Sequence, residues 1–253
     1  MLTRDDLLQA LAAIRVMAPV RADEVTPSTN ATAVEMAEDD TPEWTLVSAG
    51  HQTEGRGRMG RSWVDVPGRA LLFSLVLRPK LPPNRAGLLS LLAGAAMAEA
   101  IRDVTGRRVT CKWPNDLLLH GKKAGGILLE SSAERDRLRY VVIGVGVNLD
   151  PPADVEDAAG LGEVPMRDLV TAFLRHFARD YTSADVAFPE LVRRMWLPVS
   201  ATMGQLVEAR TTGGDVARGR AVGIDDFGSL LLSTDTGEVR VSFGEIQHLE
   251  GSA

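Results

Sequence analysis

Seven consecutive residues combine three arginines with three glycines, Gly55-Arg56-Gly57-Arg58-Met59-Gly60-Arg61, in a chain whose net charge is −6. Arginine keeps its charge and forms paired hydrogen bonds with carboxylate or phosphate. Glycine lets backbone N–H groups approach an anion closely. The loop therefore suits an anionic ligand that is covered after it binds. A solvated surface loop or a nucleic-acid patch explains the stretch equally well by itself, although the acidic balance argues against a general nucleic-acid binder.

Two lysine-containing stretches could also handle phosphate. They are Lys112-Trp113-Pro114-Asn115-Asp116 and Lys123-Ala124-Gly125-Gly126-Ile127-Leu128. Lysines beside glycines can stabilise developing negative charge. Taken alone, a hairpin with solvated lysines is the simpler interpretation.

Polar uncharged side chains occur before the arginine loop. Ser28-Thr29-Asn30 opens a helical stretch at 31–38, and helix capping is enough to explain it. The same hydroxyls and amide could instead bind a polar, uncharged ligand group. Gln52 offers amide donors and acceptors at the base of the loop, whereas His51 beside it has no role that the sequence supports.

Strands and helices must hold these stretches in place. Apolar runs at 44–49 and 70–77 predict strands on either side of the loop, and 140–148 predicts a central strand in which Gly144 and Gly146 permit close approach. That run lacks the third glycine and the following helix of a dinucleotide-binding fingerprint. Further strands are predicted at 109–112, 117–119 and 127–130, and helices at 2–14, 82–103, 166–181 and 188–196. After Pro198, short strands at 205–209, 218–224, 229–233 and 238–242 predict a small barrel.

Length and composition indicate a globular enzyme-sized chain of 253 residues with 45% hydrophobic and 25% charged residues. We expect a domain at 1–198 followed by a smaller one at 199–253. The single cysteine, Cys111, excludes an internal disulfide and a cysteine-based zinc cluster, and the four histidines show no ligand spacing, so no metal site is predicted. The charged start (Arg4, Asp5, Asp6) and the lack of an 18-residue apolar span predict a cytoplasmic protein with no membrane partner.

The order and spacing of these motifs resemble the biotin protein ligase family. The resemblance rests on Ser28-Thr29-Asn30, on the stretch from Gln52 to Trp63, on the two lysine stretches, and on Val142-Ile143-Gly144-Val145-Gly146-Val147-Asn148. It implies an α+β fold with a mixed central sheet packed with helices, similar to class II synthetases, followed by an SH3-like β-barrel. Only 27 residues precede Ser28, too few for a helix-turn-helix domain, so we expect no DNA binding and a ligase that is a monomer or weak homodimer.

The resemblance implies a two-step reaction. Biotin and ATP, with Mg²⁺ on the nucleotide, give biotinyl-5′-AMP and pyrophosphate. The biotinyl group then passes to one lysine of a biotin carboxyl carrier domain of acetyl-CoA carboxylase or a related enzyme.

The family pattern also assigns residues. The catalytic residues are Lys123, Arg58 and Asp116, with Lys123 preferred over Lys122 by its spacing to Gly126. Biotin would contact Ser28, Thr29, Asn30, Gln52, Gly55, Arg56, Gly57, Arg58, Lys123, Gly126 and Leu128. ATP and the adenylate would contact Arg56, Arg58, Arg61, Trp63, Lys112, Asn115, Lys123 and Asn148. Trp63 would stack on adenine, Asp116 would meet the acceptor lysine, and Lys112 could equally have a structural role under Trp113.

One residue departs from the pattern, and two rival functions remain. Glu54 places an acid directly before the loop, and pairing with an arginine is one way to accommodate it. A lipoate–protein ligase or octanoyl transferase resembles this fold, but the Gly-Arg loop favours biotin. A nucleic-acid-binding protein using Arg56, Arg58 and Arg61 would show salt-sensitive binding and no ATP chemistry; the net charge counts against it.

Overall fold

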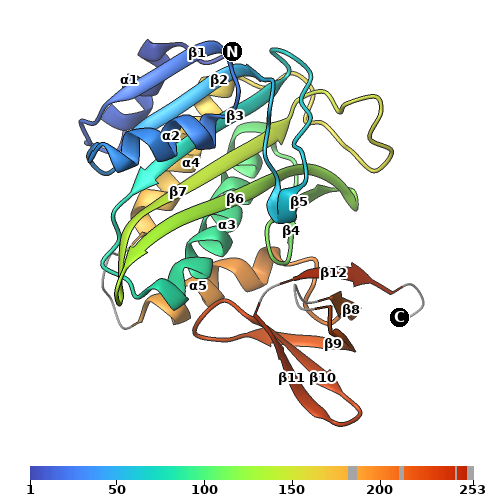
Figure 1. The fold of residues 1–253 in the computed structure, drawn as a ribbon. Coiled ribbons are helices and arrows are strands. Elements are labelled where there is room, and N and C mark those ends of the chain that lie inside the picture. Colours follow the sequence, from blue (N-terminus) through green and yellow to red (C-terminus); the bar gives the residue numbers. More distant parts are fainter. Residues whose placement is uncertain (182–186, 211–213, 243, 250–253) are drawn as a thin grey trace.

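The computed structural model describes residues 1–181, 187–210, 214–242 and 244–249. Within these ranges a large sheet packed with helices is followed by a smaller C-terminal sheet, and the two regions meet along a seam (Figure 1). None of the described helices is both long enough and apolar enough to cross a membrane.

Local capping signals mark some of the helix ends. Thr3 and Asp6 form a capping box at the first helix, in which the Asp6 carboxylate accepts from Thr3 N at 2.9 Å. The longest helix ends at Gly106, which has a φ of 71°. The helices are α1 (Arg4–Ala12), α2 (Thr29–Glu38), α3 (Ala86–Thr105), α4 (Met166–Asp180) and α5 (Phe188–Trp196), with short 3₁₀ turns η1 (Arg58–Gly60), η2 (Pro83–Arg85) and η3 (Leu197–Val199).

The large sheet has the strand order β1-β2-β3-β7-β6-β5-β4. Only the β1–β2 pair is parallel among these described strands, so the sheet is mixed. β7 occupies the middle position, as its apolar run predicts. The strands are β1 (Val20–Thr26), β2 (Leu46–Gln52), β3 (Ala70–Leu77), β4 (Thr110–Lys112), β5 (Asp116–Leu119), β6 (Lys122–Glu134) and β7 (Arg137–Asn148).

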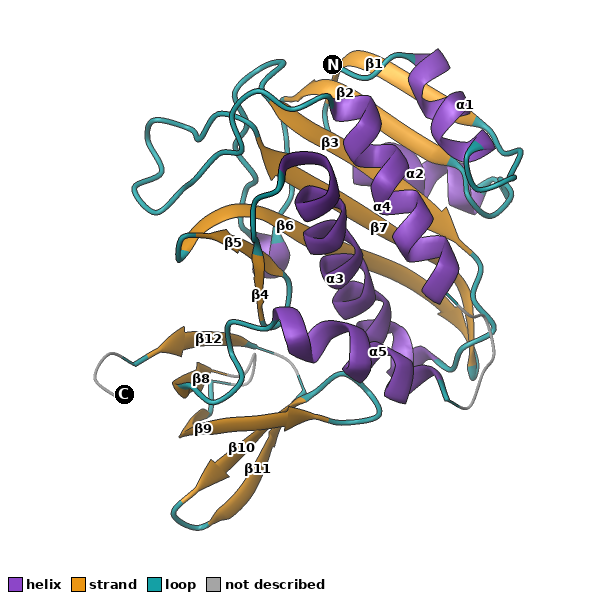
Figure 2. Ribbon diagram, turned by 180° about the vertical axis from the view of Figure 1, so that it is seen from behind, coloured by secondary structure: helices purple, strands orange, loops and turns teal. Residues whose placement is uncertain are grey.

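The two faces of this sheet are covered unequally. On one face, α1, α3, α4 and α5 cover the main core (Figure 2). In this core the ring centroids of Phe73 and Phe173 lie 5.2 Å apart. On the other face α2 alone packs on β2, β3 and β7 through a small core that includes Val47, Val76 and Val142 (Figure 1). Because α2 covers only part of its face, the sheet surface beside its N-terminus is left for a pocket.

The C-terminal region forms a five-stranded antiparallel sheet in the order β11-β10-β9-β8-β12. It docks through Trp113, whose Nε1 donates to Gly228 O at 3.0 Å and whose backbone N donates to Thr202 Oγ1 at 3.0 Å. The SH3-like barrel and the boundary at 198/199 stay predictions. The strands are β8 (Leu206–Arg210), β9 (Val216–Ile224), β10 (Leu230–Thr234), β11 (Gly237–Val241) and β12 (Glu245–His248).

The sequence missed two strands and shortened a third. β1 has a polar sequence because it is an edge strand in which only Thr26 is buried, and β12 is only four residues long. β6 begins at Lys122 rather than at residue 127, because Gly125 and Gly126 pair with β7 instead of forming a turn. The helix expected at 82–103 starts later, at Ala86, after a 3₁₀ turn.

Candidate active site

A pocket opens where the N-terminus of α2, the arginine loop, the turn between β4 and β5, and strands β6, β7 and β12 meet. Most of the residues selected from the sequence line it. The predicted residues in its wall are Ser28, Thr29, Asn30, Gln52, Arg56, Gly57, Arg58, Arg61, Trp63, Lys112, Asn115, Asp116, Lys123, Gly126 and Leu128. Gly55 and Asn148 are the two predicted residues outside this wall.

One end of the pocket is a polar, uncharged surface at the start of α2. Ser28 caps the helix, with its Oγ accepting from Ala31 N at 3.4 Å. Gln52 Oε1 accepts from both Thr29 N, at 2.7 Å, and Thr29 Oγ1, at 3.1 Å. Gln52 Nε2 has no protein acceptor within the described ranges, so its N–H groups can donate to a ligand oxygen.

Asn30 supports this surface from behind. Its Oδ1 accepts from Ser74 Oγ at 2.6 Å, and its Nδ2 donates to Glu130 Oε2 at 2.8 Å. A Cβ on Gly144 would collide with the Asn30 amide, so this glycine of β7 makes room for it. Both the Oδ1 and the Nδ2 of Asn30 are hydrogen-bonded to protein atoms. We therefore interpret Asn30 as a residue that positions the N-terminus of α2 rather than as a free ligand contact.

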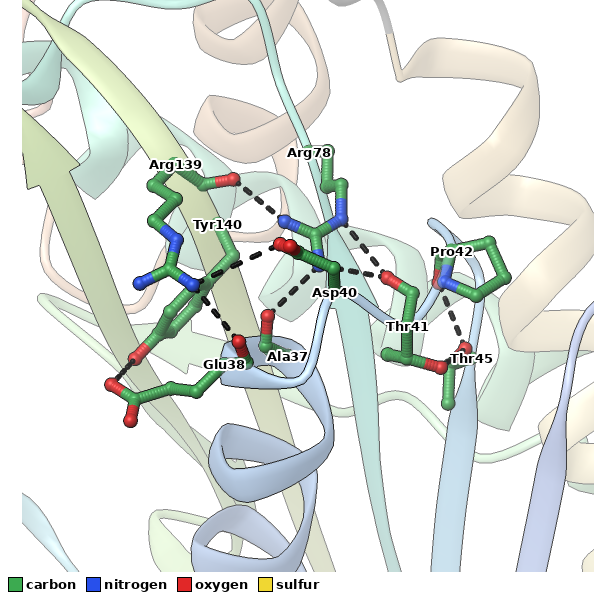
Figure 3. A network of polar contacts seen from close by, with 9 residues as sticks. All are labelled: Ala37, Glu38, Asp40, Thr41, Pro42, Thr45, Arg78, Arg139 and Tyr140. Carbon is green, nitrogen blue, oxygen red and sulfur yellow. Dashed lines mark hydrogen bonds and ion pairs between the residues drawn. The ribbon is translucent and has the colours of Figure 1, made fainter.

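The far end of α2 is anchored by two arginines (Figure 3). Arg78 Nη2 donates to Ala37 O at 2.9 Å and to Thr41 O at 2.8 Å. Arg139 Nη2 donates to Glu38 O at 2.9 Å. Cationic donors satisfy the carbonyls that a helix leaves unpaired at its C-terminus, and this fixes the helix whose other end lies at the pocket.

The arginine loop folds back on itself as a narrow hairpin. Trp63 N donates to Gly55 O at 2.9 Å, and Gly57 N donates to Arg61 O at 2.7 Å. Any Cβ at Gly55 would collide with the Trp63 carbonyl, so Gly55 allows the two limbs to approach but does not itself face the pocket. Glu54 is exposed and forms no ion pair among the described residues, so the suggested pairing with an arginine is not found.

Five cationic side chains converge on the pocket, and four of them have internal partners among the described residues. Arg56 Nη1 lies 3.9 Å from Glu130 Oε1. Lys123 Nζ lies 2.6 Å from Asp116 Oδ1, Arg58 Nη1 donates to Gly244 O at 3.2 Å, and Arg61 pairs with Glu245. Lys112 forms no ion pair within the described part of the chain. Burial lowers the pKa of Arg58, and the nearby Glu245 and Asp116 oppose that shift. Lys122 is exposed and outside the wall, which agrees with the preference for Lys123.

Trp63 lies inside the pocket against the sheet. A Cβ on Gly146 would come within 2.8 Å of its indole ring, and one on Gly126 within 3.7 Å. Its Nε1 is buried without a partner. The glycines of β6 and β7 thus admit an aromatic ring directly onto the backbone.

The two asparagines assigned to the nucleotide lie differently. Asn115 is in the wall, and its Nδ2 donates to Ile127 O at 2.9 Å. Asn148 is buried, and its Nδ2 donates to Ala159 O at 3.3 Å while its Oδ1 has no partner. Ala159 N in turn donates to Lys123 O at 2.8 Å, so Asn148 braces the segment that holds the Lys123 backbone.

Sequence reasoning missed the contribution of β12. Glu245 and Ile246 line the pocket, and Trp113, 2% exposed, serves the seam with the C-terminal sheet. A four-residue strand more than 100 residues from the lysine stretches carries no sequence signal for this contact.

Comparison with known proteins shows the family to which the chain belongs. Residues 22–148 match the biotin/lipoate A/B protein ligase family, and residues 202–249 match the biotin protein ligase C-terminal domain. The fold and the site thus define a protein ligase of the biotin/lipoate class.

Individual relatives narrow the biotin/lipoate class of ligases to the biotin protein ligases. The chain is 37% identical over 235 residues to the bifunctional ligase/repressor BirA of Bacillus subtilis, covering 88% of this chain and 72% of that one. It is 35% identical to the biotin–[acetyl-CoA-carboxylase] ligase of Paracoccus denitrificans, covering 87% and 97%. A biotin protein ligase from Aquifex aeolicus, solved in complex with biotin and ATP, shares the fold with a TM-score of 0.70 at 24% identity, covering 91% and 98%. The chain belongs to the biotin protein ligase family and is a ligase.

Proposed function

We propose that this enzyme activates biotin with ATP to biotinyl-5′-AMP, releasing pyrophosphate, and then biotinylates one lysine of a biotin carboxyl carrier domain. The proposal rests mainly on the two ends of the pocket. Five cationic side chains converge on one end, and the other end is polar and uncharged; the cationic residues are Arg56, Arg58, Arg61, Lys112 and Lys123. A molecule with a neutral polar head and a carboxylate tail fits this arrangement, and a polyphosphate fits the cationic side.

Biotin would bind with its ureido group toward α2. The N–H groups of Gln52 Nε2 and the Ser28 hydroxyl can donate to the ureido oxygen. Leu128 and Gly126 supply the apolar wall for the ring system. This places the carboxylate near Arg56, Arg58 and Lys123.

Adenylation brings two anions together, because a carboxylate oxygen of biotin attacks the α-phosphorus of ATP while pyrophosphate leaves. Charge stabilisation and positioning are the main contributions a protein can make to such a step. We assign both to Lys123 and Arg58, with Arg61 and Lys112 on the leaving phosphates. Trp63 would stack on adenine, an aromatic face against an aromatic ring, with Asn115 and the unpartnered Oδ1 of Asn148 as polar contacts.

In the transfer step the ε-ammonium group of the carrier lysine first loses one proton, the resulting amine attacks the acyl carbon, AMP leaves, and the nitrogen loses a second proton as the amide forms. Asp116 is our candidate for orienting that amine and accepting a proton. Asp116 forms an ion pair with Lys123. Before Asp116 can bind the acceptor amine, negative charge on the ligand would have to replace Asp116 beside Lys123.

Magnesium would enter with the nucleotide. No three described His, Cys, Asp or Glu residues are grouped as metal ligands. Mg²⁺ commonly binds through substrate phosphates and one or two carboxylates, so the site fits a nucleotide-borne ion, with Asp116 and Glu245 as the nearest acids.

Exchange of labelled pyrophosphate into ATP tests the proposal, with biotin, lipoate and octanoate as parallel acids. We expect exchange with biotin alone, followed by labelling of a carrier domain. Exchange with lipoate or octanoate instead would assign the chain to the sister activity.

A further inference from the structure

A buried acid closes the base of the arginine loop. The Asp65 side chain is fully buried on the returning limb of the hairpin, 13 residues after Gln52. Its Oδ1 accepts from Gln52 N at 3.2 Å, and its Oδ2 lies 2.9 Å from His51 Nδ1. One carboxylate therefore joins the two ends of the loop.

The Asp65 carboxylate also fixes the position of Gln52, the residue proposed to face the ligand. Gln52 is bonded to Asp65 through its backbone and to Thr29 through its side-chain oxygen. These bonds leave only Nε2 of Gln52 free to donate into the pocket. A shift of the backbone at residue 52 would move that donor and the start of the Gly-Arg hairpin together.

The pairing with His51 explains how an acid can be buried here. A buried carboxylate is costly unless charged or hydrogen-bonding groups compensate it. Within the described ranges His51 is the only side chain that forms a hydrogen bond or ion pair with Asp65, and the His51 side chain is 30% exposed. For an ionised Asp65 to accept a hydrogen bond from His51, Nδ1 of His51 must carry the proton.

We infer that Asp65 and His51 are positioning residues for acid binding and activation, acting through Gln52 and the base of the loop. The inference rests on the proposed function. Without the pair, Gln52 and the limbs of the hairpin lose their shared anchor. The binding of biotin should then weaken more than the binding of ATP, because Gln52 lies at the biotin end.

The test compares D65A, D65N, H51A and H51N with the parent enzyme by pyrophosphate exchange, recording KM for biotin, KM for ATP and kcat. An asparagine at 65 can still accept from Gln52 N and bond to the other tautomer of His51, and an asparagine at 51 keeps a donor near the Nδ1 position. We expect D65A and H51A to raise KM for biotin about tenfold, equivalent to ~1.4 kcal/mol. D65N and H51N should stay within about threefold of the parent.

The chain offers a matched control in His176 and Asp103, whose Nε2–Oδ2 contact of 2.8 Å joins α4 to α3 away from the pocket. D103A should affect the melting temperature without changing KM for biotin. The inference is overturned if D65A keeps the parent KM for biotin. If D65A does not fold, an unchanged KM for biotin in H51A overturns it. It is also overturned if D103A raises the KM for biotin as much as D65A does. A parent enzyme without biotin-dependent exchange would instead reject the proposed function itself.

Discussion

Lys123 Nζ lies 2.6 Å from Asp116 Oδ1 in the pocket wall, so the two residues proposed for the two chemical steps form an ion pair with each other. The neighbouring strands β5 and β6 carry them, with Asp116 opposite Gly126 in the ladder. We expect negative charge on the bound substrates to take the place of Asp116 at Lys123. Asp116 is then available to the acceptor lysine.

Replacing Lys123 with alanine should reduce biotin-dependent pyrophosphate exchange by about 10²–10³, the range typical for loss of one charge-stabilising donor. The fold should survive because the Lys123 backbone bonds to Asp157 and Ala159 do not need its side chain. Lys122→Ala is the matched control, since that neighbour is exposed and outside the pocket. Equal exchange rates in the two variants would reject the assignment of Lys123.

Asp116→Asn should separate the two half-reactions. Pyrophosphate exchange should fall only a few-fold, because the Lys123 charge remains. Transfer from preformed adenylate to a carrier domain should fall by about 10²-fold, at the low end of the range for general acid–base groups. Single-turnover transfer measured beside exchange checks this, and an equal loss in both assays would contradict a role specific to transfer.

Arg58→Gly should loosen the hold on biotinyl-5′-AMP. Arg58 is half-buried between the pocket and Gly244 O, so we expect its removal to open the loop side of the pocket to water. We expect faster release of labelled adenylate from the purified complex and biotinylation of unrelated lysines. Retention equal to that of the parent would count against this role.

Acid stability should depend on His248 in β12. Burial, and then the charge of Lys112, lower the pKa of His248 below its usual value of 6.5. The unfolded state therefore binds the proton more readily, so this contribution to stability is complete above about pH 6.5 and is lost as the pH falls below it.

Melting temperatures from pH 7.5 to 5 check this dependence. His248→Gln should show a smaller loss of stability toward acid than the parent. His120→Asn, at an exposed turn with a φ of 52°, is the control and should follow the parent. A parent-like acid slope in His248→Gln would show that other groups account for it.

Several features followed from the sequence alone. The Gly-Arg loop, the lysine stretches and Ser28-Thr29-Asn30 carry local chemistry that is independent of distant contacts. Thr3 marks the start of the first helix because capping depends on the adjacent backbone. The apolar run of β7 predicted a central strand because only a strand covered on both faces tolerates such a run.

The tertiary structure decided which residues, far apart in the sequence, form hydrogen bonds and ion pairs with one another. Nothing local in Gln52 or Asp65 shows that one side chain bonds to the other's backbone, and Glu245 reaches Arg61 across 184 residues. The sequence predicts that Asn148 is a nucleotide contact, and the tertiary structure adds a second role, because its Nδ2 donates to Ala159 O beside Lys123. Such contacts depend on which strands pair and on where β12 packs. Strand pairing and packing are determined by burial of the whole core rather than by residues that are neighbours in the sequence.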